Sequence, residues 1–261
     1  MQTLLNVNNL SVNFDTTQGI FTAVDDVSFY INKGECLGIA GESGSGKTQT
    51  FFSITGILSD NGSVSGNAYF NNIDLLRLNE KEISKIRGKQ IGFIFQDPMT
   101  SLTPHMNIGN QLIEVSMIHE NASKTDALRK AKEVLDIVKL PRIENLLKKY
   151  PHELSGGMRQ RVMIGIALMC DPLFIIADEP TTALDVTTQK EILKIFNDLK
   201  KYKDITMALI SHDIAVISEV SESILVMNEG KIVEKGDCKK VLSSPNHESV
   251  SYTHLTLPTK A

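Results

Sequence analysis

The stretch that decides the fold reads Gly41-Glu42-Ser43-Gly44-Ser45-Gly46-Lys47-Thr48. It fits the pattern Gly-x-x-x-x-Gly-Lys-[Ser/Thr] of a phosphate-binding loop, in which glycines take positive φ and backbone N–H groups surround a phosphate. In such a loop the lysine reaches the β- and γ-phosphates and the last hydroxyl binds Mg²⁺. The alternative is a flexible glycine loop without a ligand.

The residues on either side of the loop favour phosphate binding. Residues 36–40 form a short apolar run that predicts a buried strand, and residues 48–58 have the pattern of a helix. A helix that begins directly after the loop adds the partial positive charge of its N-terminus. The sequence therefore predicts that this protein binds a nucleoside triphosphate.

Length and composition bound the architecture. The chain has 261 residues, 41% of them hydrophobic, and a formal net charge of −4, which suits one large α/β domain or a domain with an insert. An acidic balance argues against nonspecific binding to nucleic acid. No secretion signal and no apolar run of membrane-spanning length are recognised. We therefore expect any role at a membrane to require a partner.

The cysteines predict a reducing compartment. Cys36, Cys170 and Cys238 form no C-x-x-C pair. Cys36 and Cys170 lie in apolar stretches, so we expect them to be buried free thiols.

Strand and helix patterns alternate along most of the chain. Residues 4–14, 20–31 and 64–70 predict a largely antiparallel layer beside the strand at 36–40. The remaining predicted elements are strands at 90–95, 173–177 and 206–210, helices at 188–200 and 214–221, and a hairpin of 224–227 with 231–234.

An all-helical block interrupts this alternation at about residues 97–160. Helices are predicted at 108–118 and 123–140; the second begins at Ser123, which with Asp126 resembles a capping box. We interpret the block as a helical subdomain inserted into one domain that covers residues 1–249. The alternative is a plain helical hairpin within a single-layer fold.

The last residues, 250–261, have no strand or helix pattern related to what precedes them. The string resembles translated read-through of a sequencing adapter, so we interpret it as an artefact and exclude it from the fold. We then expect the natural sequence to continue past Ser249 with a different C-terminus. The alternative is a genuine tail without fixed structure.

Two acids follow the apolar run at 173–177. Asp178, at the end of the predicted strand, can hold Mg²⁺ opposite Thr48, and Glu179 can polarise a water for attack on the γ-phosphate. A strand that ends in Asp-Glu is a weak signal by itself because acids are common at sheet edges. Downstream of a phosphate loop it indicates hydrolysis.

A second motif reads Leu154-Ser155-Gly156-Gly157-Met158-Arg159-Gln160-Arg161. Ser155 is a suitable N-cap, and the two glycines permit close approach of an anion to the N-terminus of a helix predicted over 158–170. The alternative is a simple glycine turn. The full string matches the signature of ATP-binding cassette (ABC) proteins. From residue 4 to about residue 247, the chain resembles the ATPase subunit of an ABC importer.

The resemblance implies the remaining site residues. Gln96 matches the Q-loop, which in the family touches Mg²⁺ or its water; His212 matches the switch histidine at the γ-phosphate; and Asp185 belongs to the D-loop, residues 182–185. The expected catalytic residues are Lys47, Gln96, Glu179 and His212, and the expected Mg²⁺ ligands are Thr48, Gln96 and Asp178. The expected ATP-binding residues are Phe14, Gly41, Glu42, Ser43, Gly44, Ser45, Gly46, Lys47, Thr48, Gln49, Ser155, Gly156, Gly157 and Asp185.

The aromatic that stacks on adenine has two candidates. The family places such a residue upstream of the phosphate loop, where Phe14 and Phe21 both qualify. We favour Phe14, although either ring can instead belong to the core.

The resemblance also implies an assembly. In the family the signature completes the site of a second cassette, so that two ATP molecules lie between two subunits. The expected partners are a second, homologous ABC ATPase in a heterodimer, two transmembrane permease subunits and, indirectly, an extracytoplasmic solute-binding protein, with no nucleic acid. The expected location is peripheral, on the cytoplasmic face of the cell membrane.

Finer likeness narrows the class. Residues 41–47, 96–104 and 151–161 resemble the oligopeptide/dipeptide and nickel importer branch, and Met158 fits that branch. Thr48 replaces the commoner serine but keeps the hydroxyl, whereas Thr103 replaces an asparagine with no effect that we can assign. The expected fold is α/β: a P-loop NTPase core with an antiparallel β subdomain and an inserted α-helical subdomain.

These observations predict an ATP-hydrolysing subunit that powers uptake of di- or oligopeptides. Three alternatives stay open: the same machinery for nickel or another small solute, a soluble ABC ATPase that acts in translation or DNA repair, and a non-catalytic module gated by ATP. The intact Glu179 and His212 argue against the last.

Overall fold

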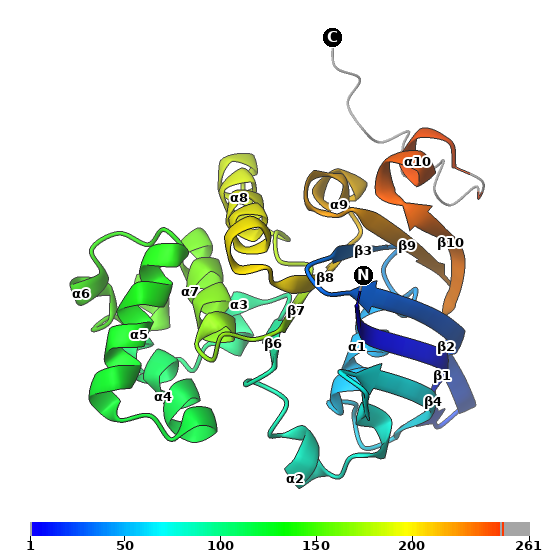
Figure 1. Ribbon diagram of the computed structural model, residues 1–261, viewed down its shortest axis with the longest axis horizontal. Coiled ribbons are helices and arrows are strands. Elements are labelled where there is room, and N and C mark those ends of the chain that lie inside the picture. Colours follow the sequence, from blue (N-terminus) through cyan, green and yellow to red (C-terminus); the bar gives the residue numbers. More distant parts are fainter. Residues whose placement is uncertain (1, 246, 248–261) are drawn as a thin grey trace. The chain divides into compact units, whose positions relative to one another are not determined.

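The computed structural model describes residues 2–245 and 247 (Figure 1). The chain divides into two units: the first combines residues up to 83 with those from 206 onward, and the second is the continuous segment 84–205. The stretch 250–261, interpreted above as an adapter artefact, lies outside the described residues. The helical insert expected at 97–160 falls within the second unit, and its boundaries stay a prediction.

The first unit contains the predicted antiparallel layer. Its strands are β1 (Thr3–Thr16), β2 (Gly19–Asn32), β4 (Gly62–Phe70) and β5 (Ile73–Asp74), in the order β2-β1-β4-β5. All three pairings are antiparallel, which confirms the prediction. Strand β1 buries Leu5 and Val7 by the two-residue alternation of a strand, and a register shift between Val7 and Leu10 resets the alternation so that Leu10 and Val12 are buried as well.

A second set of strands in this unit carries the phosphate loop. Strand β3 (Cys36–Ala40) lies between β8 (Thr206–Ser211) and β9 (Ser223–Asn228) and is parallel to both. Strand β10 (Lys231–Asp237) pairs antiparallel with β9, as the predicted hairpin requires. Every residue of β3 is buried, as its unbroken apolar run predicts for a central parallel strand.

The helices of the first unit are short. They are α1 (Lys47–Thr55), α2 (Glu80–Ile83), α9 (Ile214–Val220), α10 (Cys238–Ser243) and the 3₁₀ turn η1 (Leu75–Arg77). Helix α1 ends earlier than the predicted residue 58 because Gly56 takes a left-handed conformation, with φ of 67°, and its N–H caps the helix. Ile214, Ile217 and Val241 pack around Ala40 and Cys238 in one hydrophobic cluster.

The second unit combines two parallel strands with a bundle of helices. Strands β6 (Ile91–Ile94) and β7 (Phe174–Asp178) are parallel neighbours. Figure 1 shows α4, α5 and α7 side by side. The helices are α3 (Pro98–Ser101), α4 (Ile108–Glu120), α5 (Lys124–Ile137), α6 (Ile143–Leu146), α7 (Gly156–Leu168), α8 (Val186–Lys203) and the 3₁₀ turn η2 (Pro151–Glu153).

The two ends of helix α5 are set by local features of the sequence and backbone. Ser123 is its N-cap: its Oγ accepts the N–H of Asp126 at 3.1 Å and donates to the Asp126 carboxylate at 2.6 Å. These contacts confirm the predicted helix start and lower the pKa of Asp126, chiefly through the Ser123 hydroxyl. The helix ends at Ile137, before the predicted Leu140, because Lys139 takes a left-handed φ of 60°.

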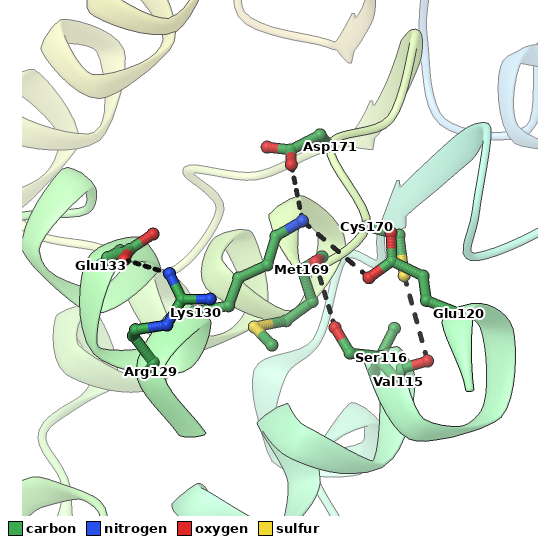
Figure 2. Close-up of polar contacts among 9 residues, drawn as sticks. All are labelled: Val115, Ser116, Glu120, Arg129, Lys130, Glu133, Met169, Cys170 and Asp171. Carbon is green, nitrogen blue, oxygen red and sulfur yellow. Dashed lines mark hydrogen bonds and ion pairs between the residues drawn. The ribbon is translucent and has the colours of Figure 1, made fainter. Parts of the chain in front are cut away.

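Polar contacts hold α4 and α5 to the segment between α7 and β7 (Figure 2). Lys130 of α5 places Nζ 2.5 Å from Asp171 and 3.9 Å from Glu120 at the end of α4. Ser116 of α4 donates to the carbonyl oxygen of Met169 at 3.3 Å. These contacts fix the segment from which β7 begins.

The three cysteines are buried thiols outside any disulfide in the described part of the chain, which confirms the prediction for Cys36 and Cys170. Burial raises the pKa of the Cys170 thiol to about 11, with the nearby Glu120 carboxylate adding to the effect. Burial also raises the pKa of Cys238. Among the described residues, none of the helices has both the length and the apolar character needed to span a bilayer.

Candidate nucleotide site

The phosphate loop takes the conformation that its glycines predict. Gly41, Gly44 and Gly46 have φ of 150°, 83° and 98°, the region in which side chains are strained. A Cβ on Gly41 would lie 2.3 Å from the carbonyl oxygen of Met227, and one on Gly46 would lie 2.5 Å from that of Ala23. Gly44 meets no atom within 4 Å, so only its backbone conformation requires glycine. The loop has no room for side chains at its two ends.

Polar groups inside the loop fit a phosphate. The side chain of Lys47 is buried and its Nζ donates to the carbonyl oxygens of Gly41 and Glu42, both at 2.7 Å, so the ammonium lies across the loop. The Ser45 hydroxyl is buried without a hydrogen-bond partner among the described residues. A buried unpaired hydroxyl is costly unless a ligand or water bonds to it. An ammonium, an unpaired hydroxyl and a helix N-terminus therefore converge at one anion-binding loop.

The turn between β9 and β10 supports the loop. Gly230 donates its N–H to the Ser45 carbonyl at 3.1 Å and accepts the N–H of Asp25 at 2.8 Å. Lys231 forms an ion pair with Asp25 at 3.2 Å. The loop is thus fixed from both β2 and the β9–β10 hairpin.

His212 lies at the same sheet edge as the phosphate loop. Ala40 of β3 pairs with Ser211 of β8 in the parallel register, so Gly41 and His212 follow neighbouring strands at their carboxyl ends. The side chain of His212 is exposed. Asp213 caps α9 by accepting the N–H of Ala215 at 2.8 Å, which fixes the backbone beside the histidine. The structure therefore brings the predicted switch histidine to the loop's edge of the sheet.

In the second unit the predicted acids and Gln96 meet at the carboxyl ends of β6 and β7. Ile94 pairs with Ala177, so Gln96 and Glu179 each lie two residues beyond this pair. Gln96 Nε2 lies 3.5 Å from Glu179 Oε2, at the limit of hydrogen bonding. Asp178 is buried and Glu179 is half-buried. Gln96 and Glu179 thus lie together, and Asp178 is the residue before Glu179 at the end of β7.

Glu179 has a further partner that the sequence analysis missed. The Thr182 hydroxyl donates to Glu179 Oε2 at 2.8 Å. Thr182 is part of the D-loop, but the family resemblance assigns the role in that motif to Asp185. The sequence therefore did not point to Thr182. Thr182 follows Glu179 by three residues, with Pro180 between them. This spacing predicts a β-turn that brings the two residues together.

The signature motif forms the start of α7. Ser155 is the N-cap and its Oγ accepts the N–H of Met158 at 3.3 Å; the helix begins at Gly156, two residues before the prediction. A Cβ on Gly157 would lie 2.5 Å from Cγ2 of Thr188 on α8, whereas one on Gly156 meets only a Leu184 methyl at 3.9 Å. Gly157 therefore serves the packing of α7 on α8, a role that the sequence did not suggest.

Asp185 caps α8. Its carboxylate accepts the N–H of Thr188 at 2.9 Å and the Thr188 hydroxyl at 2.7 Å, and these bonds lower its pKa. Since Thr188 also lies against Gly157, the D-loop and the signature motif share one contact residue.

Phe14 and Phe21 are cross-strand neighbours on β1 and β2. Phe14 is half-buried beside Gly62, where its ring lies 3.0 Å from the position of a Cβ, and Phe21 is 58% exposed. Both rings therefore stand at one end of the antiparallel sheet, and the choice of Phe14 stays a prediction.

A phosphate loop between a central parallel strand and a helix, with acids at the end of a parallel strand, defines a P-loop nucleoside triphosphatase. A family model described as "ABC transporter" matches residues 24–182. The chain belongs to the ABC transporter family, as one of its ATP-hydrolysing cassettes.

The chain is 50% identical over 244 residues to the "Oligopeptide transport ATP-binding protein OppD" of Escherichia coli strain K12, an alignment that covers 94% of this chain and 72% of the relative. It is 45% identical to the "Dipeptide transport ATP-binding protein DppD" of Bacillus subtilis strain 168, with 95% and 74% covered.

The similar solved structures are cassettes as well. The ATP-binding cassette MJ0796, solved as a dimer bound to ADP and Pi, superposes with a TM-score of 0.81 at 28% identity, covering 90% of this chain and 98% of that one. The cassette cbiO1 of Clostridium perfringens gives 0.78 at 29% identity, with 99% and 97% covered. The predicted fold class is confirmed.

Proposed function

We propose that this chain is the ATP-hydrolysing subunit of an importer that takes up di- and oligopeptides. The observation that carries the substrate class is the 50% identity, over 94% of the chain, to a relative named for oligopeptide transport. A second relative named for dipeptide transport, 45% identical, supports the same class.

The phosphate loop is proposed to bind the triphosphate of ATP. Backbone N–H groups of residues 41–48 and the N-terminus of α1 surround the phosphates. Lys47 exchanges its bonds to Gly41 and Glu42 for bonds to phosphate oxygens, and the Ser45 hydroxyl gains the partner that it lacks among the described residues. Gln49 and the aromatic Phe14 complete the proposed contacts.

Hydrolysis is proposed to depend on the residues at the ends of β6 and β7. Glu179 accepts a proton from the attacking water, and Asp178, Thr48 and Gln96 offer oxygen atoms to Mg²⁺. Carboxylate, hydroxyl and amide oxygens are the donors that Mg²⁺ prefers, so these residues fit it. When bound, Mg²⁺ neutralises charge on the β- and γ-phosphates.

His212 and Lys47 are proposed to stabilise the γ-phosphoryl group as it leaves. Both follow neighbouring parallel strands, β8 and β3, at one sheet edge. A donor already in place at that edge lowers the energy of the transition state without reorganisation during the reaction.

The chain is proposed to act as one of two ATPase subunits. The similar cassette MJ0796 was solved as a dimer, and Ser155, Gly156, Gly157 and Asp185 stand at the starts of α7 and α8, where helix N-termini favour anions. These residues would bind the nucleotide of a homologous partner subunit. Two permease subunits are the proposed membrane partners, with this chain peripheral on the cytoplasmic face.

The ATPase proposal is tested with Glu179→Gln in the assembled importer. We expect the variant to bind ATP with unchanged affinity while its turnover falls by two orders of magnitude or more, since general-base catalysis contributes about 10²–10⁴-fold. Lys47→Ala, which should lose binding itself, is the matched control. Wild-type turnover of the glutamine variant would refute the assignment of the base.

Peptide uptake is tested in cells that lack the gene. Labelled tripeptide uptake should return with the wild-type gene and fail with the gene for Glu179→Gln. Nickel uptake, measured in the same strains, serves as the contrast. If nickel and not peptide uptake follows the gene, the peptide assignment is wrong.

A further inference from the structure

The residue after Asp178 has an unusual backbone. Glu179 has φ of 45°, in the left-handed region, although it carries a side chain. Such conformations persist only where surrounding contacts hold them, and they concentrate at functional sites. The contacts of Glu179 therefore indicate which residues hold it in this conformation.

Residues 179–182, Glu-Pro-Thr-Thr, close a tight turn. Thr182 donates its backbone N–H to the Glu179 carbonyl at 3.2 Å, the bond of a four-residue turn. Proline at the second position presets the φ that this turn needs. The turn brings the Thr182 side chain back to the residue that began it.

The same residue also holds the Glu179 side chain. The Thr182 hydroxyl donates to Glu179 Oε2 at 2.8 Å, a normal hydrogen bond to a carboxylate. Gln96 Nε2, at 3.5 Å from the same oxygen, is a much weaker contact. A bond fixed to one carboxylate oxygen limits the rotation of the group, so the orientation of the carboxylate is set before a water arrives.

We propose that Thr182 is a positioning residue for ATP hydrolysis, which acts by orienting the carboxylate of Glu179. The proposal rests on the assignment of Glu179 as general base. Rate depends steeply on such orientation, because a misplacement of about 1 Å can cost 10²-fold. The backbone bond fixes the turn and the hydroxyl fixes the base, so the two effects can be separated by substitution.

Thr182→Val is the matched substitution. Valine has the shape of threonine and keeps the backbone N–H to Glu179, but it lacks the hydroxyl. We expect kcat for ATP hydrolysis by the assembled importer to fall about tenfold, with KM for ATP unchanged, since hydrogen bonds to charged groups are worth about tenfold or more. Thr182→Ser, which keeps the hydroxyl, should restore most of kcat. Thr182→Ala is the second variant in case valine disturbs folding.

A double mutant separates positioning from a merely structural role. If Thr182 acts through Glu179, adding Thr182→Val to Glu179→Gln should lower the residual rate by less than twofold. A further tenfold loss in that background, or wild-type kcat for both Thr182→Val and Thr182→Ala, would overturn the proposal. Wild-type turnover of Glu179→Gln alone would instead refute the base, whatever Thr182 does.

Discussion

Gly157→Ala tests the packing of the signature helix on α8. A Cβ at this position would lie 2.5 Å from Cγ2 of Thr188, about 1 Å inside the optimal carbon–carbon separation of 3.5–4.0 Å. Thr188 cannot rotate away cheaply, because its hydroxyl holds Asp185 at 2.7 Å. Either the α8 cap breaks or the two helices move apart.

The expected change in the free energy of unfolding is the balance of two opposed effects. Overpacking of this kind costs about 1–3 kcal/mol, while alanine gains up to about 1 kcal/mol over glycine in a helix. With a packing cost of about 2 kcal/mol, the middle of that range, we expect a net loss of about 1–2 kcal/mol. For a protein of this size that loss lowers Tm by roughly 2–8 °C.

Scanning calorimetry of three variants gives the test. Gly156→Ala, which meets only a methyl at 3.9 Å, should be neutral or slightly stabilising. Thr188→Ser removes the obstructing methyl and keeps the hydroxyl, so it should recover most of the Tm lost by Gly157→Ala. If Gly157→Ala is as stable as the wild type, or if serine at 188 recovers nothing, the steric reasoning is wrong.

Three further predictions concern stability and binding. Because burial raises the pKa of Cys170 from 9.0 to about 11, the folded state favours the protonated thiol, so the free energy of unfolding should fall as pH rises from 9 to 11. Urea titrations should show a shallower fall for Cys170→Ala. Gln160→Met should leave Tm unchanged or raise it by a few degrees, since the buried Gln160 Nε2 has no hydrogen-bond partner among the described residues. A large drop in Tm would contradict this prediction. Gly46→Ala should abolish ATP binding in calorimetric titrations, because its Cβ would lie 2.5 Å from a backbone oxygen and its φ of 98° is strained for alanine; measurable wild-type affinity would contradict this.

Much of the fold was predictable because local patterns and tertiary contacts agree. The buried run at 36–40 became β3 with unchanged bounds, and the Ser123 cap started α5 where predicted. The differences lie at helix ends. Gly56 and Lys139 stop α1 and α5 through left-handed backbone, which apolar periodicity does not reveal.

Site residues could be predicted where a motif gives them a role in binding or catalysis. Residues that support another side chain were harder to predict. Strand register explains why Gln96 and Glu179 meet, and that register follows from the parallel pairing of β6 and β7. The contact of Gly157 with Thr188 joins residues 31 positions apart, and spacing alone cannot find it. The same glycine pattern suits ligand approach and helix packing alike.

The bonds through Gly230 bear on the order in which the protein is made. They join the loop carbonyl of Ser45, the β2 residue Asp25 and the β9–β10 turn, so the phosphate loop is supported by residues almost two hundred positions downstream. Contacts of such long range form late, because the intervening chain must first be ordered. The ribosome must therefore translate the chain past Gly230 before these bonds can form. We therefore expect fragments that end before β10 to bind nucleotide more weakly than the full chain.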